Sequence, residues 1–323
     1  LSMHQESDGH RSLHRFGRHK GCNCSGRGIP CDAAGTSLAV FPFLGAGQTH
    51  LVGKYRDTVA RGLRWLVENH KADGDLRAGA SGNSGMYAHG QAAIVLCEAY
   101  AMTGDEQLRI PAQKAIDFIV KAQHAAGGWR YFPGDPGDTS VFTWQLMALQ
   151  TARAGKLDVP EKTLQLAGQF LDSVGHQDGA RYSYLPTRQP THSMTAAGLL
   201  CRVYLGWNKE DNPQLVEGVD WLATERPPSP RNPSNSRTFT LYYWYHATQL
   251  MHHVGGPQWE RWNLKMRHVL VDSQVTSGED AGSWYFSGPW ARLGGRLYMT
   301  AIAICTLEVY YRHAPMFRQM KLD

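Results

Sequence analysis

The chain has 323 residues, enough to bury a large hydrophobic core, and its net charge of +5 is too small to favour a nucleic-acid partner. Aromatic residues are abundant, with 10 Trp, 14 Tyr and 10 Phe. No uncharged run is long enough to span a bilayer and no signal peptide opens the chain, so its localisation stays open. Peripheral contact with a membrane is still compatible with this composition.

The first residues, Leu1 to Gln5, have the pattern of the end of a helix. We therefore expect that the natural protein continues upstream, and that 1–323 is one domain truncated at its N-terminus. Residues 10–31 form a loop rich in Cys, His and Arg. Its cysteines, Cys22, Cys24 and Cys31, could bind zinc together with a nearby histidine. The alternatives are free thiols, or one disulfide with one cysteine left over.

A short motif recurs along the chain: Gln or His, then Gly a few residues later, often followed by an aromatic residue. Copies fall at residues 5–9, 70–74, 123–129, 177–179 and 274–284, with a degenerate copy at 225–228. The spacing of roughly 50 residues is typical of a helix–loop–helix repeat.

An amphipathic segment precedes most copies of this motif. Apolar residues recur there at helical spacing and polar residues occupy the other face, which predicts helices with one wet side. These predicted outer helices cover residues 55–70, 106–124, 160–176, 212–224 and 257–274.

A segment that is apolar nearly all round follows each copy. A helix with no polar face must be buried on all sides. These predicted inner helices cover residues 33–44, 86–102, 139–152, 192–205, 240–253 and 297–310. Six inner helices that alternate with outer ones predict an all-α protein, a six-fold α/α toroid, in preference to an open solenoid.

The Gln-x-x-x-Gly-x-Trp form at Gln123, Gly127 and Trp129 resembles the QW repeat of squalene and hopene cyclases. A longer version ends at Trp284. The helix pairing is also similar to the β subunits of protein prenyltransferases. The resemblance implies a double ring of helices around a central aromatic cavity, with an isoprenoid or another apolar molecule as the ligand.

The resemblance also extends to the cyclase motif Asp-x-Asp-Asp-Thr. Residues 135–139 read Asp-Pro-Gly-Asp-Thr, so Gly137 stands where those cyclases carry their proton-donating aspartate. Standard class II cyclisation is therefore not expected. Asp138 has two interpretations, a catalytic acid or an N-cap for the helix that follows. The zinc motif of the prenyltransferases, Asp-x-Cys, does not occur.

The first turns of the inner helices carry the candidate site residues, because in a ring those turns share one mouth. Histidine can serve as an acid or base, and aromatic faces can stabilise a cation. The candidate catalytic residues are Asp138, His89, His246 and Tyr243. The candidate ligand-binding residues are Tyr87, Trp144, His192, Trp244, Arg296 and Tyr298. For each of them the alternative is an ordinary packing role in the core.

Three functions are compatible with this pattern. The first is a protein similar to terpenoid cyclases or prenyltransferases that binds an apolar ligand, with or without turnover. The second is a carbohydrate-active toroid, more easily a lyase using Tyr and His than a glycosidase, since no convincing pair of carboxylates is found. The third is a non-catalytic scaffold domain of a longer protein.

Overall fold

The computed structural model describes residues 1–15, 24–80, 82–224, 241–286 and 291–312. Within these ranges the protein is all-α. The inner helices are α1 (Asp32–Gly45), α3 (Gly85–Thr103), α5 (Thr139–Ala154), α7 (His192–Tyr204), α9 (Leu241–Val254) and α11 (Ala291–Leu307). The outer helices are α2 (Arg56–Glu68), α4 (Glu106–Ala122), α6 (Glu161–Ser173), α8 (Pro213–Thr224) and α10 (Gly256–Ser273).

The remaining elements are short. Two strands, β1 (Gly175–His176) and β2 (Arg181–Tyr182), form one antiparallel hairpin. Single 3-10 turns occur at η1 (Ser2–His4), η3 (Gly82–Ser84), η4 (Gln177–Gly179) and η6 (Glu308–Tyr310). In the part of the chain that the structure describes, no helix is long and apolar enough to cross a bilayer.

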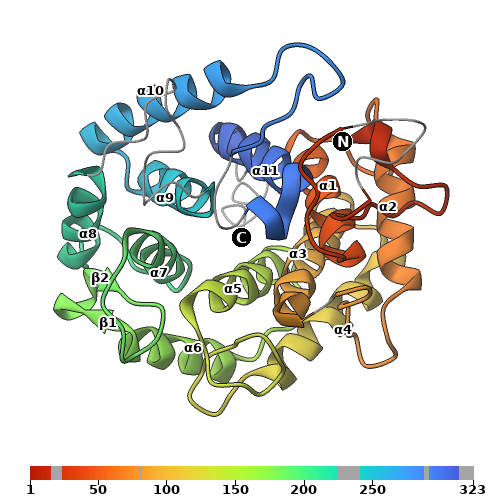
Figure 1. The fold of residues 1–323 in the computed structure, drawn as a ribbon. Helices are drawn as coiled ribbons and strands as arrows, with labels where there is room; N and C mark the ends of the chain where they lie inside the picture. Colours follow the sequence, from red (N-terminus) through yellow and green to blue (C-terminus); the bar gives the residue numbers. More distant parts are fainter. Residues whose placement is uncertain (16–23, 81, 225–240, 287–290, 313–323) are drawn as a thin grey trace.

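The inner helices form a closed ring, with the outer helices arranged around it (Figure 1). Each inner helix packs against the next one in the chain, and α11 packs against α1, which closes the circle. The predicted α/α toroid is thus confirmed, and an open solenoid is excluded. Most helix bounds lie within two residues of their prediction. The main exception is α11, which begins at Ala291 and has a non-helical residue at Gly295.

In three copies of the sequence motif, the recurring glycine places the loop against the outer helix of the next repeat: Gly9 against α2, Gly74 against α4 and Gly127 against α6. Gly127 has a φ of 86°, and a Cβ built on it would lie 1.8 Å from the carbonyl oxygen of Leu166 on α6. Only glycine fits such a left-handed, closely packed position. The glycines of the other copies, Gly9, Gly74, Gly179 and Gly282, also have positive φ.

The glutamine and the tryptophan of the motif form hydrogen bonds that hold the same loop. The side chain of Gln123 donates to the carbonyl oxygens of Gly127 (2.9 Å) and of Thr163 on α6 (3.0 Å). The indole of Trp129 donates to Ile119 on α4 (2.8 Å), and that of Trp284 donates to Leu270 on α10 (2.7 Å). The motif is therefore explained by the construction of the ring, whatever the ring binds.

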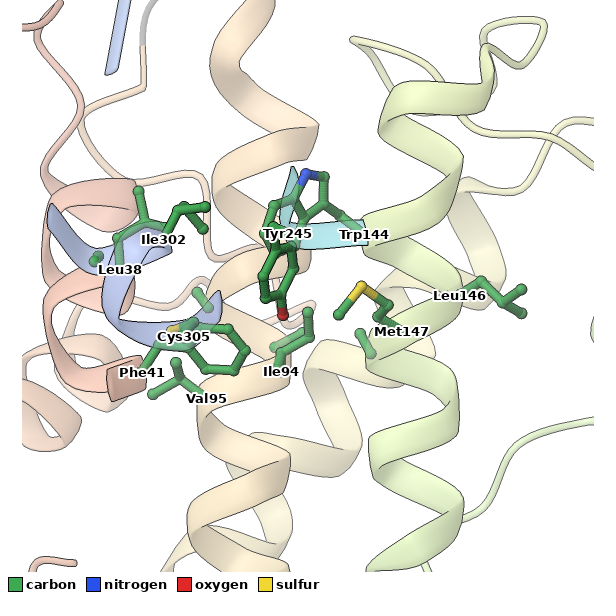
Figure 2. Packing of buried hydrophobic residues seen from close by; sticks show 14 of the residues in the cluster. Leu38, Phe41, Ile94, Val95, Trp144, Leu146, Met147, Tyr245, Ile302 and Cys305 are labelled. Atoms are coloured by element: carbon green, nitrogen blue, oxygen red, sulfur yellow. The ribbon is translucent and has the colours of Figure 1, made fainter. Parts of the chain in front are cut away.

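The middle of the ring is filled by side chains of the inner helices (Figure 2). Trp144 on α5 stacks on Tyr245 on α9, with ring centroids 5.9 Å apart and planes 12° apart. Beside this stack, a gap with no room for a water molecule is bordered by Ser37, Leu38, Phe41, Gln91, Ile94 and Trp144. A ligand on the ring axis would have to displace these side chains.

A buried ionic cluster joins three inner helices near their C-terminal ends. Arg312 donates to both carboxylate oxygens of Glu98 on α3 (3.0 and 2.7 Å) and to Glu308 (2.9 Å). It also donates to the carbonyl oxygen of Phe41 on α1 and lies over that residue's ring. Gly45 leaves the necessary space, since a Cβ there would lie 2.1 Å from the guanidinium.

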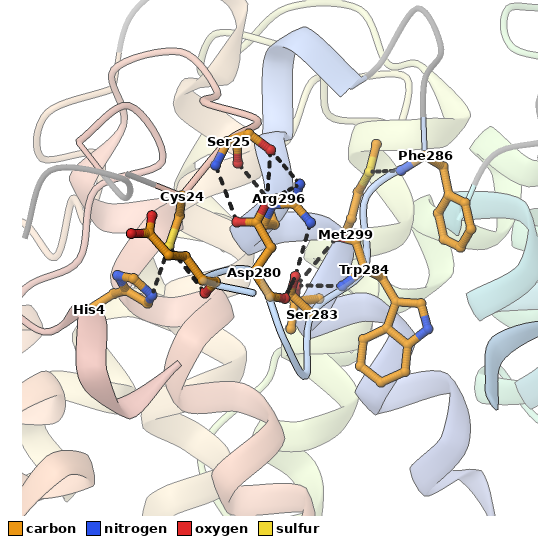
Figure 3. A network of polar contacts seen from close by, with 11 residues as sticks. His4, Cys24, Ser25, Asp280, Ser283, Trp284, Phe286, Arg296 and Met299 are labelled. Atoms are coloured by element: carbon orange, nitrogen blue, oxygen red, sulfur yellow. Dashed lines mark hydrogen bonds and ion pairs between the residues drawn. The ribbon is translucent and has the colours of Figure 1, made fainter. Parts of the chain in front are cut away.

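A second polar network joins the N-terminal segment to the last repeat (Figure 3). Arg296 on α11 donates to the backbone carbonyl of Ser25 (2.8 Å) and to the hydroxyls of Ser25 (2.6 Å) and Ser283 (2.9 Å). Asp280 pairs with Arg296 at 3.0 Å and accepts a hydrogen bond from Ser25. These contacts connect the two ends of the described chain.

Candidate functional site

Asp138 is the N-cap of α5. Its Oδ1 accepts hydrogen bonds from the backbone N–H groups of Ser140 and Val141 (both 2.9 Å) and from the Ser140 hydroxyl (2.6 Å). An aspartate before a run of helix-forming residues commonly takes this place, because it satisfies N–H groups that have no partner within the helix. Asp138 is thus an N-cap, and Oδ1 is the oxygen that makes this cap.

The second oxygen of Asp138 is in a different situation. Oδ2 is buried and accepts no hydrogen bond, and it lies 3.7 Å from the Nε of Arg130. The Nε of Arg130 is also buried and without a hydrogen-bond acceptor, although a third of that side chain is exposed. Burial raises the pKa of the Asp138 carboxyl, and its hydrogen bonds with Ser140 and Val141, together with the nearby Tyr184 hydroxyl, oppose the rise.

Four tyrosines surround this pair. The hydroxyl of Tyr87 on α3 bonds that of Ser140 (2.5 Å), and the hydroxyl of Tyr242 on α9 donates to the Ser140 carbonyl (3.3 Å). Tyr131 and Tyr184 share a hydrogen bond between their hydroxyls at 2.5 Å. We call the set the Asp138 cluster: Tyr87, Arg130, Tyr131, Asp138, Ser140, Tyr184 and Tyr242.

The Asp138 cluster combines a cation, a carboxylate and hydroxyl groups on a partly exposed aromatic surface. The guanidinium of Arg130 lies over the rings of Tyr131 (5.1 Å) and Tyr184 (6.0 Å). Burial raises the pKa values of Tyr87, Tyr184 and Tyr242, so these phenols are protonated at neutral pH and can donate hydrogen bonds. Such a surface can bind an anionic, hydroxyl-rich ligand.

His89 holds the fold together at another place. Its Nδ1 accepts from the N–H of Leu76 in the preceding loop, and its Nε2 donates to the carbonyl of Ala115 on α4, both at 3.1 Å. Burial lowers the pKa of His89 to about 4, so it is neutral. Both ring nitrogens are engaged, and the ring has no exposed surface.

The candidates on α7 and α9 fall into separate groups. His246 donates from Nδ1 to the carbonyl of Tyr242 (2.7 Å), and burial lowers its pKa to about 4. Tyr243 points outward, where its hydroxyl donates to Leu222 on α8 (3.4 Å). His192 stacks on Trp221 of α8, with centroids 3.9 Å apart. His192 also contacts the ring of Tyr243 edge-on, with centroids 6.2 Å apart, whereas His246 contacts Trp144 at 5.9 Å, so these candidates lie in two places.

The other candidates are mostly packing residues. Trp144 packs beside Tyr245 among the buried side chains (Figure 2), and Trp244 is buried with an edge contact to Phe286 at 6.2 Å. Arg296 belongs to the network of Figure 3. Tyr298 is partly buried, and its burial raises its pKa. Among the ten candidates, Tyr87 and Asp138 are brought together by their contacts with Ser140, and ring contacts join His192 to Tyr243 and Trp144 to His246.

The cysteine loop lies only partly within the described residues. Cys22 is outside them, Cys24 is disulfide-bonded, and Cys31 is a buried free thiol. Among the residues that the structure describes, no group of three or more His, Cys, Asp or Glu side chains could hold a metal ion. A zinc site on these cysteines thus has no support in the geometry, and it stays a prediction.

Sequence reasoning missed Arg130, Tyr131 and Tyr184. A usable signal was present in the repeat, because Tyr131 and Tyr184 are 53 residues apart, and so are Tyr87 and Ser140. Side chains one repeat apart come into contact at the mouth.

A hollow of about 260 Å³ on the outer surface, between α8 and α10, contains none of the candidates; it is lined by Asp220, Ala223, Thr224, Gln258, Arg261, Trp262 and Lys265.

The comparisons with known sequences match one part of the chain. The family model described as pectic acid lyase matches residues 68–177, about a third of the length. This segment includes Tyr87, Arg130, Tyr131, Asp138 and Ser140. No curated protein matches the sequence at a significant level.

Several solved structures share the fold. A sugar epimerase from a ruminal bacterium has a TM-score of 0.64 at 11% identity, covering 96% of this chain and 94% of that one. A cellobiose 2-epimerase from Bacillus thermoamylovorans B4167 has a TM-score of 0.60 at 11% identity, covering 85% and 87%. A type II terpene cyclase from Scytonema in complex with geranylgeranyl dihydroxybenzoate also has a TM-score of 0.60 at 12% identity, covering 97% and 93%. At these identities the likeness shows the α/α toroid and leaves the ligand open.

Proposed function

We propose that the protein binds an acidic polysaccharide at the Asp138 cluster and that its activity is lyase-like. The observation that carries this proposal is the position of Arg130: a third of its side chain is exposed, and its guanidinium lies over the rings of Tyr131 and Tyr184 beside phenolic hydroxyls. A guanidinium recognises a carboxylate through charge-assisted hydrogen bonds, and aromatic faces pack on sugar rings.

The match to the pectic acid lyase model supports the same site, because it covers five of the seven residues of the Asp138 cluster. An elimination needs the charge of the uronate carboxylate to be neutralised, a proton to reach the leaving oxygen, and a base to take the proton from the carbon next to the carboxylate. Arg130 is placed for the first task. The phenol of Tyr184, whose pKa is raised by burial, suits the second.

The test is an assay of polygalacturonate cleavage by the ultraviolet absorbance of the unsaturated product. We expect cleavage by the wild type, strong loss in Arg130→Gln and in Tyr184→Phe, and unchanged cleavage in Arg153→Gln. Arg153 is an exposed arginine near the other end of α5, so it controls for the loss of one positive charge. Equal activity in all four proteins would place the site elsewhere.

The second candidate is a protein that binds an isoprenoid, and the aromatic stack of Trp144 and Tyr245 on the ring axis favours it. The likeness to a terpene cyclase supports it to the same degree that the epimerases support a sugar. We rank it second because the axial side chains fill the space that the ligand would need. Retention of a geranylgeranyl compound by the wild type, lost in Trp144→Ala and kept in Arg130→Gln, would reverse this ranking.

A further inference from the structure

We propose that Arg130 keeps Asp138 ionised in the ligand-free protein, and that Asp138 takes up a proton when an anionic ligand engages the guanidinium. The coupling of these two residues is a property of the free protein. The nature of the anion rests on the function proposed above.

The two oxygens of the Asp138 carboxyl group have different surroundings. Oδ1 of Asp138 accepts three hydrogen bonds, from two backbone N–H groups and one hydroxyl. These bonds satisfy the first turn of α5. Oδ2 is as deeply buried but accepts none, so capping does not account for it.

Several titratable side chains surround Oδ2 of Asp138. The titratable side chains facing the carboxyl are Tyr87 from α3, Arg130 and Tyr131 from the loop before α5, Tyr184 from the loop before α7, and Tyr242 from α9. Tyr87, Tyr184 and Tyr242 are neutral at ordinary pH, because burial raises the pKa values of their phenols. Arg130 supplies the positive charge of this set.

Arg130 and Asp138 form an ion pair without a hydrogen bond. The Nε of Arg130 lies 3.7 Å from Oδ2, close enough for a strong charge interaction and too far for a hydrogen bond. Arg130 is therefore held loosely, and the exposed third of its side chain can turn toward a ligand. Asp138 is fully buried, so an ionised carboxylate left without that charge is strongly disfavoured.

Binding of an anion at Arg130 should cause Asp138 to take up a proton. An anion bound to Arg130 cancels its positive charge and brings a negative charge close to Oδ2. Both effects favour the protonated form of Asp138, which could then donate a hydrogen bond from Oδ2. By linkage, the affinity of the site for an anion rises as the pH falls.

The coupling can be measured without a ligand. Infrared titration follows the C=O stretch of the protonated Asp138 carboxyl, and Asp138→Asn, which retains an oxygen for the cap, identifies the band by its disappearance. We expect Arg130→Gln to raise the titration midpoint of that band by about one pH unit or more. Arg153→Gln should leave it unchanged. An identical midpoint in Arg130→Gln and the wild type would overturn the proposal.

The ligand-linked step is measured by calorimetric titration with trigalacturonate in two buffers of different ionisation enthalpy. We expect net proton uptake on binding to the wild type, and binding with no uptake by Asp138→Asn. Binding without uptake by the wild type would refute the linkage. If the infrared midpoint shifts but trigalacturonate does not bind, the coupling stands and the proposed function is wrong.

Discussion

Arg312 binds both carboxylate oxygens of Glu98, at 3.0 and 2.7 Å, although 214 residues separate them in the chain. The contact joins α3 to the segment that follows α11, beside the C-terminal end of α1. Because both side chains are almost fully buried, neither charge is solvated by water. The pair therefore links α3 to the last part of the described chain across the buried interior.

Replacing Arg312 with Met should destabilise the fold strongly, because it leaves two carboxyl groups buried without their cation. Breaking a buried ion pair from one side costs about 3–5 kcal/mol. The measurement is the free energy of unfolding in urea. Arg153→Met, at an exposed position, should change it by less than about 0.5 kcal/mol. Similar values for the two variants would mean that the cluster is not a structural link.

Glu308 should make stability depend on pH. Burial raises the pKa of its carboxyl to about 7, from an ordinary value of 4.5, although Arg312 opposes the shift. The folded state thus holds this proton more tightly than the unfolded chain does. The contribution of this proton to the free energy of unfolding is fully present below about pH 4.5, and it is lost as the pH rises toward 7.

This dependence can be isolated by comparing the wild type with Glu308→Gln, which cannot titrate there. Between about pH 5 and about pH 8, the melting temperature of the wild type should fall more than that of the variant. Other groups titrate equally in both proteins, so their effects cancel. Parallel curves would contradict the raised pKa.

The loop motif predicts a contrast between two glycines of the same loop. Gly127 and Gly134 both have positive φ, but a Cβ on Gly127 would meet Leu166, whereas one on Gly134 would have nothing within 4 Å. Gly134→Ala should therefore cost only the backbone strain, about 1–2 kcal/mol. Gly127→Ala should cost clearly more, as measured by urea unfolding. Equal costs would show that α6 moves aside freely.

Most of the ring could be predicted from the sequence, because each element has a local signal. The fully apolar segments gave α3 and α5 within two residues, and the Gly-containing motif marked the loops. The break at Gly295 was not foreseen, since the helix before it is short and depends on contacts with residues 26–28. Long-range contacts of that kind have no local pattern.

The site was harder to predict than the fold. Tyr87 lies on α3 and Asp138 caps α5, and both are recognisable from the pattern of the inner helices, whereas Arg130 follows a tryptophan in a loop and looks like an ordinary solvated residue. Its importance depends on Tyr184, which the next repeat supplies. Likewise, Glu98 showed no partner in the sequence, because Arg312 reaches it only after the ring closes.

The two roles of Asp138 can be separated by substitution. Asp138→Asn retains an oxygen for the N–H groups of Ser140 and Val141, so its free energy of unfolding should stay within about 0.5 kcal/mol of the wild type. Asp138→Ala loses the cap, and the expected cost is about 0.5–2 kcal/mol. A large loss in the Asn variant would mean that the charge itself stabilises the fold.

The central claim is that the guanidinium of Arg130 is the anion-recognising group of the Asp138 cluster. The most direct measurement is the Kd of trigalacturonate for the wild type, Arg130→Gln and Arg153→Gln, with the neutral sugar maltotriose as a parallel ligand. Loss of a charge-assisted hydrogen bond of about 1.5–3 kcal/mol predicts a Kd raised roughly tenfold to a hundredfold in Arg130→Gln alone. Equal affinities in the three proteins, or tighter binding of maltotriose by the wild type, would contradict the account.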